Sequence, residues 1–174
     1  MALTLHAALV PQWLQIIGSV EGLVDKAEQW CSEKGLPAED VIGACLAEDM
    51  LPFAYQVKSC WAHSAYAIER AQHGRFEPEM APPPSDFAGL RTKLAQARSG
   101  LETLDPALLD SIADNPMVFA IGDKLRLDFT VQNFLLGFSQ PNLFFHASTA
   151  YGILRNKGLP IGKVDFLGRM PLSA

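Results

Sequence analysis

The stretch Pro141–Arg155, PNLFFHASTAYGILR, decides the fold because its apolar residues recur at helical spacing. At about 100° per residue, one face collects Leu143, Ala147, Ala150, Tyr151 and Leu154. Pro141 suits the first turn of a helix, and Lys157–Pro160 (KGLP) ends it. We therefore predict a long helix that runs to about Asn156.

Three earlier segments show the same period. The first runs from about Thr4 to Cys31, with Gly35 and Pro37 after its end, and the second from about Leu46 to Gln72. Pro52 interrupts the second segment, so either Asp49 caps a helix with Pro52 in its first turn or the helix is kinked. A third helix is predicted after the connector Pro78–Pro84, with these buried positions: Phe87, Leu90, Leu94, Ala97 and Leu101.

One segment changes to the period of a strand. Met117–Ile121 precedes Gly122–Asp123, and Lys124–Phe129 then alternates between charged and apolar residues. Gly-Asp is typical of a two-residue hairpin turn, so we predict a small β-hairpin. A lone hairpin is only marginally stable, and its Leu125, Leu127 and Phe129 face is therefore expected to cover a helix surface.

These elements predict an all-α fold in one domain over residues 1–174. The architecture is an up-and-down four-helix bundle with a small β-hairpin before the last long helix. Strands that alternate with helices are missing from the pattern, which argues against a doubly wound nucleotide-binding sheet. The sequence also contains no GxGxxG, GxxxxGK[ST], HExxH or GxSxG motif.

Composition limits the partners. The net charge is −5, with the 14 basic residues scattered, which argues against a nucleic-acid surface. The three cysteines form no CxxC pair and fit a reducing cytoplasm. The N-terminus lacks the basic start of a secretory signal, and no apolar run reaches the roughly 18 residues that span a bilayer. We expect a cytoplasmic protein that does not bind membranes.

Chemistry is expected where the second and fourth helices meet. Six polar side chains on their facing flanks form the candidate site: Asp49, Gln56, Cys60, His63, Asn142 and His146. A carboxylate and a neutral imidazole are suitable ligands for a divalent metal, so Asp49 and His146 are candidate ligands. The alternative is that His146 hydrogen-bonds Asp49 or a backbone carbonyl and has only a structural role.

Nucleophilic catalysis has weaker support. Ser148 and Thr149 diverge from His146 on a helix and cannot pair with it. Cys60 lies three residues before His63, which would suit a thiol–imidazole pair, or equally a buried thiol beside a surface histidine. No catalytic residue is assigned on this basis.

Three stretches resemble a known family. They are Glu48–Val57 (EDMLPFAYQV), Phe119–Phe129 (FAIGDKLRLDF) and Asn133–Gly168, which ends in Asp165–Gly168 (DFLG). In order and spacing the chain resembles the DUF1993 family of uncharacterised bacterial proteins, within the DinB/YfiT-like superfamily of four-helix bundles. The family has no assigned activity.

The resemblance implies a divalent metal site, for zinc, nickel or iron, held in the superfamily by three histidines. Their positions fall on Asn142, on His146 and near Asp49, so only His146 is a histidine here. The resemblance also implies a homodimer formed through helix faces and a small-molecule ligand, with thiol-linked transfer or hydrolysis as the reaction. The alternative is a non-enzymatic dimeric binding or assembly module with a degenerate metal site.

Overall fold

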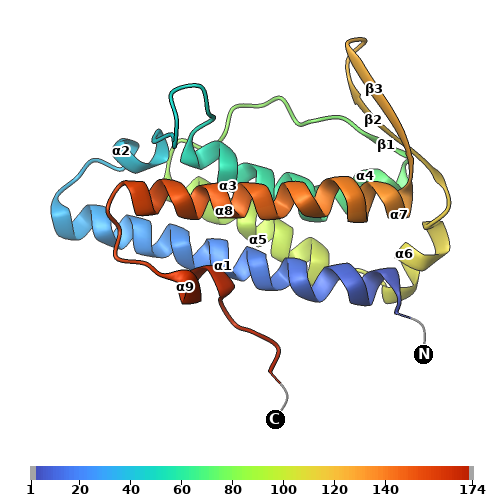
Figure 1. Cartoon of the computed structure of the whole chain (residues 1–174), viewed down its shortest axis with the longest axis horizontal. Coiled ribbons are helices and arrows are strands. Elements are labelled where there is room, and N and C mark those ends of the chain that lie inside the picture. Colours follow the sequence, from blue (N-terminus) through green and yellow to red (C-terminus); the bar gives the residue numbers. More distant parts are fainter. Residues whose placement is uncertain (1–2, 173–174) are drawn as a thin grey trace.

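The computed structural model describes residues 3–172, which form a mostly helical fold with a small three-stranded sheet. Long helical segments lie side by side, and a hairpin projects at one end (Figure 1). The long segments are α1 (Leu5–Lys34), α3 (Phe53–Trp61) with η1 (Ala62–Tyr66) and α4 (Ala67–Gln72), α5 (Phe87–Glu102), and α7 (Val131–Phe134) with η2 (Leu135–Ser139) and α8 (Gln140–Asn156). The short helices are α2 (Glu39–Ile42), α6 (Pro106–Ile112) and α9 (Lys163–Leu167).

The predicted apolar stripes form the core. All five residues predicted for α5 are buried, as are the eight that recur through the first helix: Leu9, Trp13, Ile16, Ile17, Val20, Leu23, Val24 and Ala27. Thr4 and Asp86 cap α1 and α5 through side-chain oxygens that accept backbone N–H groups. Gly35 ends α1 in the left-handed region, at φ 65°, where glycine carries no Cβ penalty.

The second long helix begins later than its pattern predicts. It starts at Phe53 rather than near Leu46, and Pro52 is an extended residue immediately before it (φ −72°, ψ 169°). A proline disfavours helical backbone at the residue before it, so the segment that precedes Pro52 cannot continue the helix. As a result Asp49 lies in an exposed turn outside α3.

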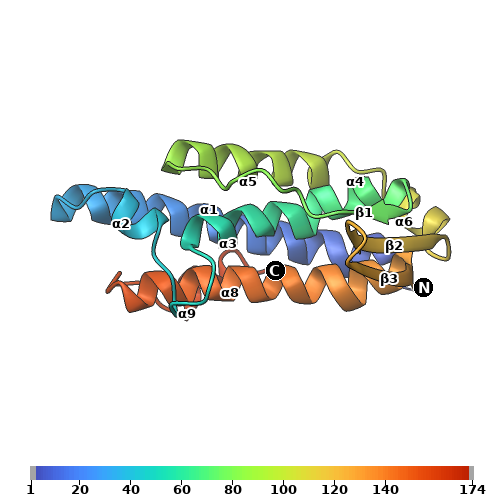
Figure 2. The ribbon, with the colours of Figure 1, turned by 90° about the horizontal axis from the view of Figure 1, so that it is seen from above.

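The helices do not follow the predicted up-and-down order. Residues 77–86, called the strap below, run back along the molecule after α4, so α5 starts near the end where α3 starts (Figures 1 and 2). Lys93 lies over the Trp61 ring and Gly100 faces Ala65, which shows that α3 and α5 run in the same direction. In an up-and-down bundle these two consecutive long helices would be antiparallel.

The hairpin belongs to a sheet of order β1-β2-β3. Strand β1 (Arg75–Phe76) pairs parallel to β2 (Pro116–Ile121), which pairs antiparallel to β3 (Leu125–Thr130) through a three-residue turn. The expectation that the Leu125 and Leu127 face covers a helix is wrong, because the hairpin extends past the helices (Figure 1). These side chains are 40% and 37% exposed, and only Phe129 at the base of the hairpin packs on the core.

The C-terminal segment packs on α1. Gln15 and Ser19 donate side-chain hydrogen bonds to the carbonyls of Leu167 (2.7 Å) and Phe166 (2.6 Å). Gly168 has a φ of 59°, and a Cβ there would lie 2.5 Å from the Ser19 hydroxyl. Glycine is therefore required where this segment crosses α1.

The expectation that no segment is long and apolar enough to cross a membrane is wrong, because α1 meets this criterion by length and composition. The helix contains an 18-residue window with a mean hydropathy of 1.2. Half of that window is buried inside the fold, as in the core helix of a soluble protein. A core helix and a membrane-spanning helix both meet this criterion, so the cytoplasmic location stays a prediction.

Candidate functional site

A cavity of about 230 Å³ opens between α3, the strap, β2 and α8. Aromatic rings form much of its wall, and the polar side chains on it include two histidines, an asparagine, a lysine and a glutamate. The lining residues are Tyr55, Lys58, Ser59, Ala62, His63, Phe76, Pro78, Glu79, Phe119, Ile121, Phe138, Asn142 and His146. An apolar cavity with a few convergent polar groups is the usual form of a small-molecule site.

Both π-helical turns found in residues 3–172 border this cavity. His63 lies in η1 and Phe138 in η2, and their rings meet edge to face with centroids 5.8 Å apart. The His63 backbone leaves helical geometry, at φ −91° and ψ 15°. Single π-helical turns within α-helices are frequent at functional sites, because they redirect side chains that a regular helix would align differently.

A relay of hydrogen bonds fixes the tautomer of His146. The Gln56 amide donates to the Leu51 carbonyl at 2.7 Å, so its own carbonyl oxygen faces His146 Nδ1, also at 2.7 Å. Nδ1 must therefore carry the proton, and the neutral ring keeps its acceptor lone pair on Nε2. Burial lowers the pKa of His146 to about 4, so the ring is neutral at pH 7.

His63 stacks on His146 and has no partner for its buried Nδ1 among the described residues. The two imidazole rings are nearly parallel, at 14°, with centroids 5.6 Å apart. The Phe76 ring also stacks on His63, with centroids 5.7 Å apart. Burial, and secondarily the neighbouring His146, lower the pKa of His63 to about 3. Two imidazoles that are both neutral at pH 7 therefore line one cavity.

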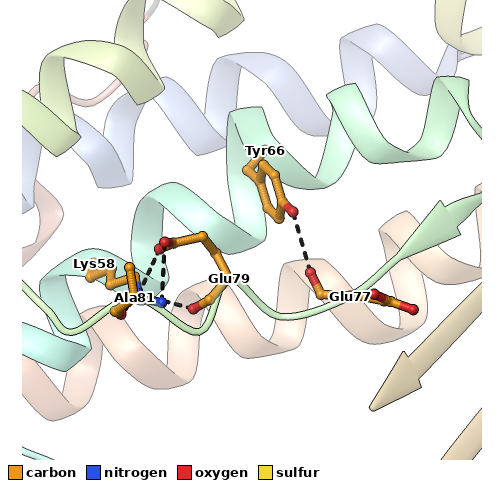
Figure 3. A network of polar contacts seen from close by, with 5 residues as sticks. All are labelled: Lys58, Tyr66, Glu77, Glu79 and Ala81. Atoms are coloured by element: carbon orange, nitrogen blue, oxygen red, sulfur yellow. Dashed lines mark hydrogen bonds and ion pairs between the residues drawn. The ribbon is translucent and has the colours of Figure 1, made fainter. Parts of the chain in front are cut away.

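Lys58 holds the strap against the cavity (Figure 3). Its side chain is only 4% exposed, and its ammonium group contacts the Glu79 carboxylate at 2.6 Å. The same group donates to the carbonyl of Glu79 at 2.9 Å and to the carbonyl of Ala81. Two strap carbonyls and one strap carboxylate thus surround the ammonium group, and Tyr66 adds a hydrogen bond to the Glu77 carbonyl at 3.3 Å.

The candidate residues predicted from sequence divide into three groups. His63, Asn142 and His146 line the cavity, and Gln56 is buried directly behind His146. Cys60 is buried and does not line the cavity; its thiol contacts the backbone carbonyl of Gln56 at 3.3 Å, and burial raises the pKa of this thiol. Asp49 is exposed and is not part of the cavity wall, so the predicted Asp49–His146 contact does not form.

The donor set fits only part of a metal site. The cavity offers two neutral imidazoles, and Asn142 adds an amide oxygen because its Nδ2 donates to the Phe138 carbonyl at 2.7 Å. Over residues 3–172, no group of three or more His, Cys, Asp or Glu side chains is arranged to hold a metal ion. A catalytic zinc usually has three strong protein ligands, so this set is one ligand short.

Sequence reasoning missed the residues that close the cavity. Lys58 could have been found, because a lysine next to the apolar stripe of a buried helix needs a partner. Glu79 gave no such signal, since its position depends on how the proline-rich strap returns over α3. The aromatic wall of Phe76, Phe119 and Phe138 depends on the pairing of β1 with β2 and on η2.

Comparisons with known proteins agree with this fold. A crystal structure of a DinB family member protein from Shewanella denitrificans matches with a TM-score of 0.81 and 27% sequence identity, over 98% of this chain and 95% of that chain. No curated protein matches the chain. The model of the family called Domain of unknown function (DUF1993) matches residues 5–167. The chain therefore belongs to the DUF1993 family and has a DinB-like structural neighbour.

Proposed function

We propose that the chain binds a small organic molecule that donates hydrogen bonds, such as a primary amine, in the histidine cavity. One observation carries this proposal: the free polar atoms that line the cavity are mainly acceptors. They are Nε2 of His146, the Asn142 side-chain oxygen and, in the tautomer protonated at Nε2, the unpartnered Nδ1 of His63. The hydroxyls of Tyr55 and Ser59 on the same wall can accept as well as donate.

The charged groups of the cavity favour the same ligand. The Lys58 ammonium is surrounded by two strap carbonyls and the Glu79 carboxylate, which disfavours its use by an anionic ligand. Glu79 keeps a carboxylate on the wall, and the hydrogen bond from Lys58 lowers its pKa. Aromatic faces such as Phe76 and Phe138 attract cations as well as apolar groups. An ammonium group on a small apolar body therefore complements the cavity.

Binding is tested with two probes of nearly equal shape and opposite charge. Benzylamine is expected to shift the imidazole NMR signals of His63 and His146 in a saturable way, and benzoate is not. Asn142→Leu, which removes one acceptor, should weaken benzylamine binding about tenfold. His73→Ala changes an exposed histidine and should leave binding unchanged. Equal or tighter binding of benzoate would refute the proposal.

A divalent metal is a second candidate ligand for this cavity. It is favoured by the side-chain carbonyl of Gln56, which accepts the hydrogen bond from His146 Nδ1. Histidines that bind metals usually donate their other ring N–H to a carbonyl or carboxylate in this way. His146 and His63 would hold the ion, with Asn142 as a weak third ligand, and the ion would polarise a bound molecule. The donor set favours loose binding of zinc, nickel or iron, and transfer or hydrolysis would depend on that ion.

Metal content separates the two candidates. Protein purified without an affinity tag would be analysed by elemental mass spectrometry, beside His146→Ala and Asp49→Ala. Near-stoichiometric metal that disappears in His146→Ala and persists in Asp49→Ala would support a metal site in the histidine cavity. Loss of metal in Asp49→Ala would instead support the site implied by the family resemblance. Metal-free protein that still binds benzylamine would leave the amine site as the function.

A further inference from the structure

We propose that β3 is a dimerisation strand and pairs antiparallel with β3 of a second copy of this chain, around a two-fold axis at Leu127. Strand β3 is an edge of the sheet, since β2 lies between it and β1 and no other strand of the described residues pairs with it. An edge strand leaves every second N–H and C=O group without a strand partner. Six consecutive residues of β3 are available for pairing.

The exposure of the strand agrees with a missing partner. Leu125 and Leu127 are 40% and 37% exposed, as is Ile121 on the neighbouring strand at 39%. These apolar side chains continue the face that buries Phe119 at the base of the hairpin. The hairpin projects beyond the helices, so a second copy could approach its free edge (Figure 1).

The sequence of β3 is self-complementary, which identifies the partner as a second copy. With the axis at Leu127, Arg126 of each copy lies opposite Asp128 of the other, and Leu125 lies opposite Phe129. Two cross-strand ion pairs and two apolar pairs then form on opposite faces of the extended sheet. Among the described residues of the single chain, Arg126 and Asp128 pair only with each other, at 2.7 Å, and their side chains are 62% and 67% exposed.

Other registers are less favourable. An axis at Arg126 or at Asp128 would place two like charges directly opposite each other, which destabilises strand pairing. An axis between two residues would place Arg126 or Asp128 opposite a leucine, but directly opposite residues of an antiparallel pair share one face of the sheet, so this arrangement forms no regular ladder. The sequence of β3 therefore favours pairing in one register, which distinguishes specific dimerisation from non-specific aggregation.

The geometry also closes the assembly at two copies. Each chain contributes one free β3 edge, and the two edges satisfy each other in a symmetric pair. The opposite edge of the sheet, β1, has only two residues, Arg75 and Phe76, and gives little template for further strands. This interface differs from the helix-face dimer implied by the family resemblance, and it is independent of the ligand proposed for the cavity.

Charge reversal tests the register directly. Wild-type protein should sediment as a dimer, whereas Arg126→Asp and Asp128→Arg should each weaken dimerisation at least about tenfold, because like charges then face each other twice. An equal mixture of the two variants should form a heterodimer, in which every facing pair has opposite charges. The double variant, Arg126→Asp with Asp128→Arg, should again form a homodimer.

Arg91→Asp is the matched control. It makes the same charge change at an exposed ion pair between α5 and α1, and it should leave the dimer intact. Far-ultraviolet circular dichroism would confirm that each variant is folded. The proposal is overturned if wild-type protein is monomeric at its highest soluble concentration, if Arg126→Asp still dimerises fully, or if the mixed variants fail to associate. Dissociation by Arg91→Asp alone would place the interface on the helices.

Discussion

Replacing Lys58 with methionine tests the strap contact most directly. Methionine keeps most of the buried chain length and removes the ammonium group that binds Glu79 and Ala81. Hydrogen bonds to a charged group contribute about 1.5–3 kcal/mol each, and breaking a buried ion pair costs about 3–5 kcal/mol. Here water can replace part of the loss, because the Glu79 side chain is 28% exposed and Ala81 is exposed. We expect the free energy of unfolding to fall by about 2 kcal/mol.

Urea unfolding of Lys58→Met beside Arg91→Met measures this loss. Arg91 makes a comparable number of contacts, to Asp25 and Glu28, but on the surface, so its replacement should cost less than about 1 kcal/mol. Equal losses in the two variants, or a loss below about 0.5 kcal/mol in Lys58→Met, would refute the reasoning. A changed slope with denaturant would show instead that the variant unfolds differently.

The same pair of proteins has a distinct pH dependence. The hydrogen bond from Lys58 lowers the pKa of Glu79 in the folded state. Its contribution to stability is therefore complete above the pKa of the unfolded chain, about 4.3, and is lost as the pH falls through the folded value. Wild-type protein should consequently lose more stability than Lys58→Met on acidification below about pH 5. Parallel losses would argue against this ion pair.

Two further predictions concern the histidines and the glycines. The imidazole NMR signals of His63 and His146 should stay constant from about pH 8 to pH 5, since their pKa values are about 3 and about 4. The unfolded chain takes up these protons near pH 6.5, so each histidine should lower the free energy of unfolding by about 2 kcal/mol at pH 5. Urea unfolding measures this loss, and titration of either ring near pH 6.5 in the folded protein would contradict both results. Gly168→Ala should destabilise the protein by at least about 1 kcal/mol in thermal unfolding, because Gly168 has a positive φ and lies against Ser19. Gly22 in α1 has open space around it, so Gly22→Ala should stabilise the protein by up to about 1 kcal/mol in the same assay. The reverse order of the two alanine variants would show that the crossing over α1 tolerates a Cβ.

Local chemistry allowed most of the fold to be predicted from sequence. The stripes of α1 and α5, the cap at Asp86 and the left-handed Gly35 each follow from residues within one or two helical turns. The β-hairpin is also local, and alternation was sufficient to find it. The strand β1 was missed because two residues, Arg75 and Phe76, carry no periodicity, and their pairing with β2 is long-range.

The direction of α5 depends on information that no local pattern contains. A proline-rich connector can turn the chain back at once or carry it along the molecule, and the buried ammonium of Lys58 favours the second course. Prediction of the candidate site failed for related reasons. Asp49 was placed on a helix that Pro52 does not allow, while His63, Asn142 and His146 came together because their helices do pack.

The two π-helical turns have a consequence for how the family can change. A π-turn takes up one residue more than the α-helical turn it replaces. Deleting a single codon within Ala62–Tyr66 would therefore let α3 continue as a regular α-helix, with the later residues of that segment still on their present faces. The bundle could survive this change because the helix contacts on either side stay in place, but the turn that positions His63 against His146 would be lost. Relatives can thus gain or lose this cavity through insertions and deletions of one residue, and substitution alone is a poor guide to which of them keep it.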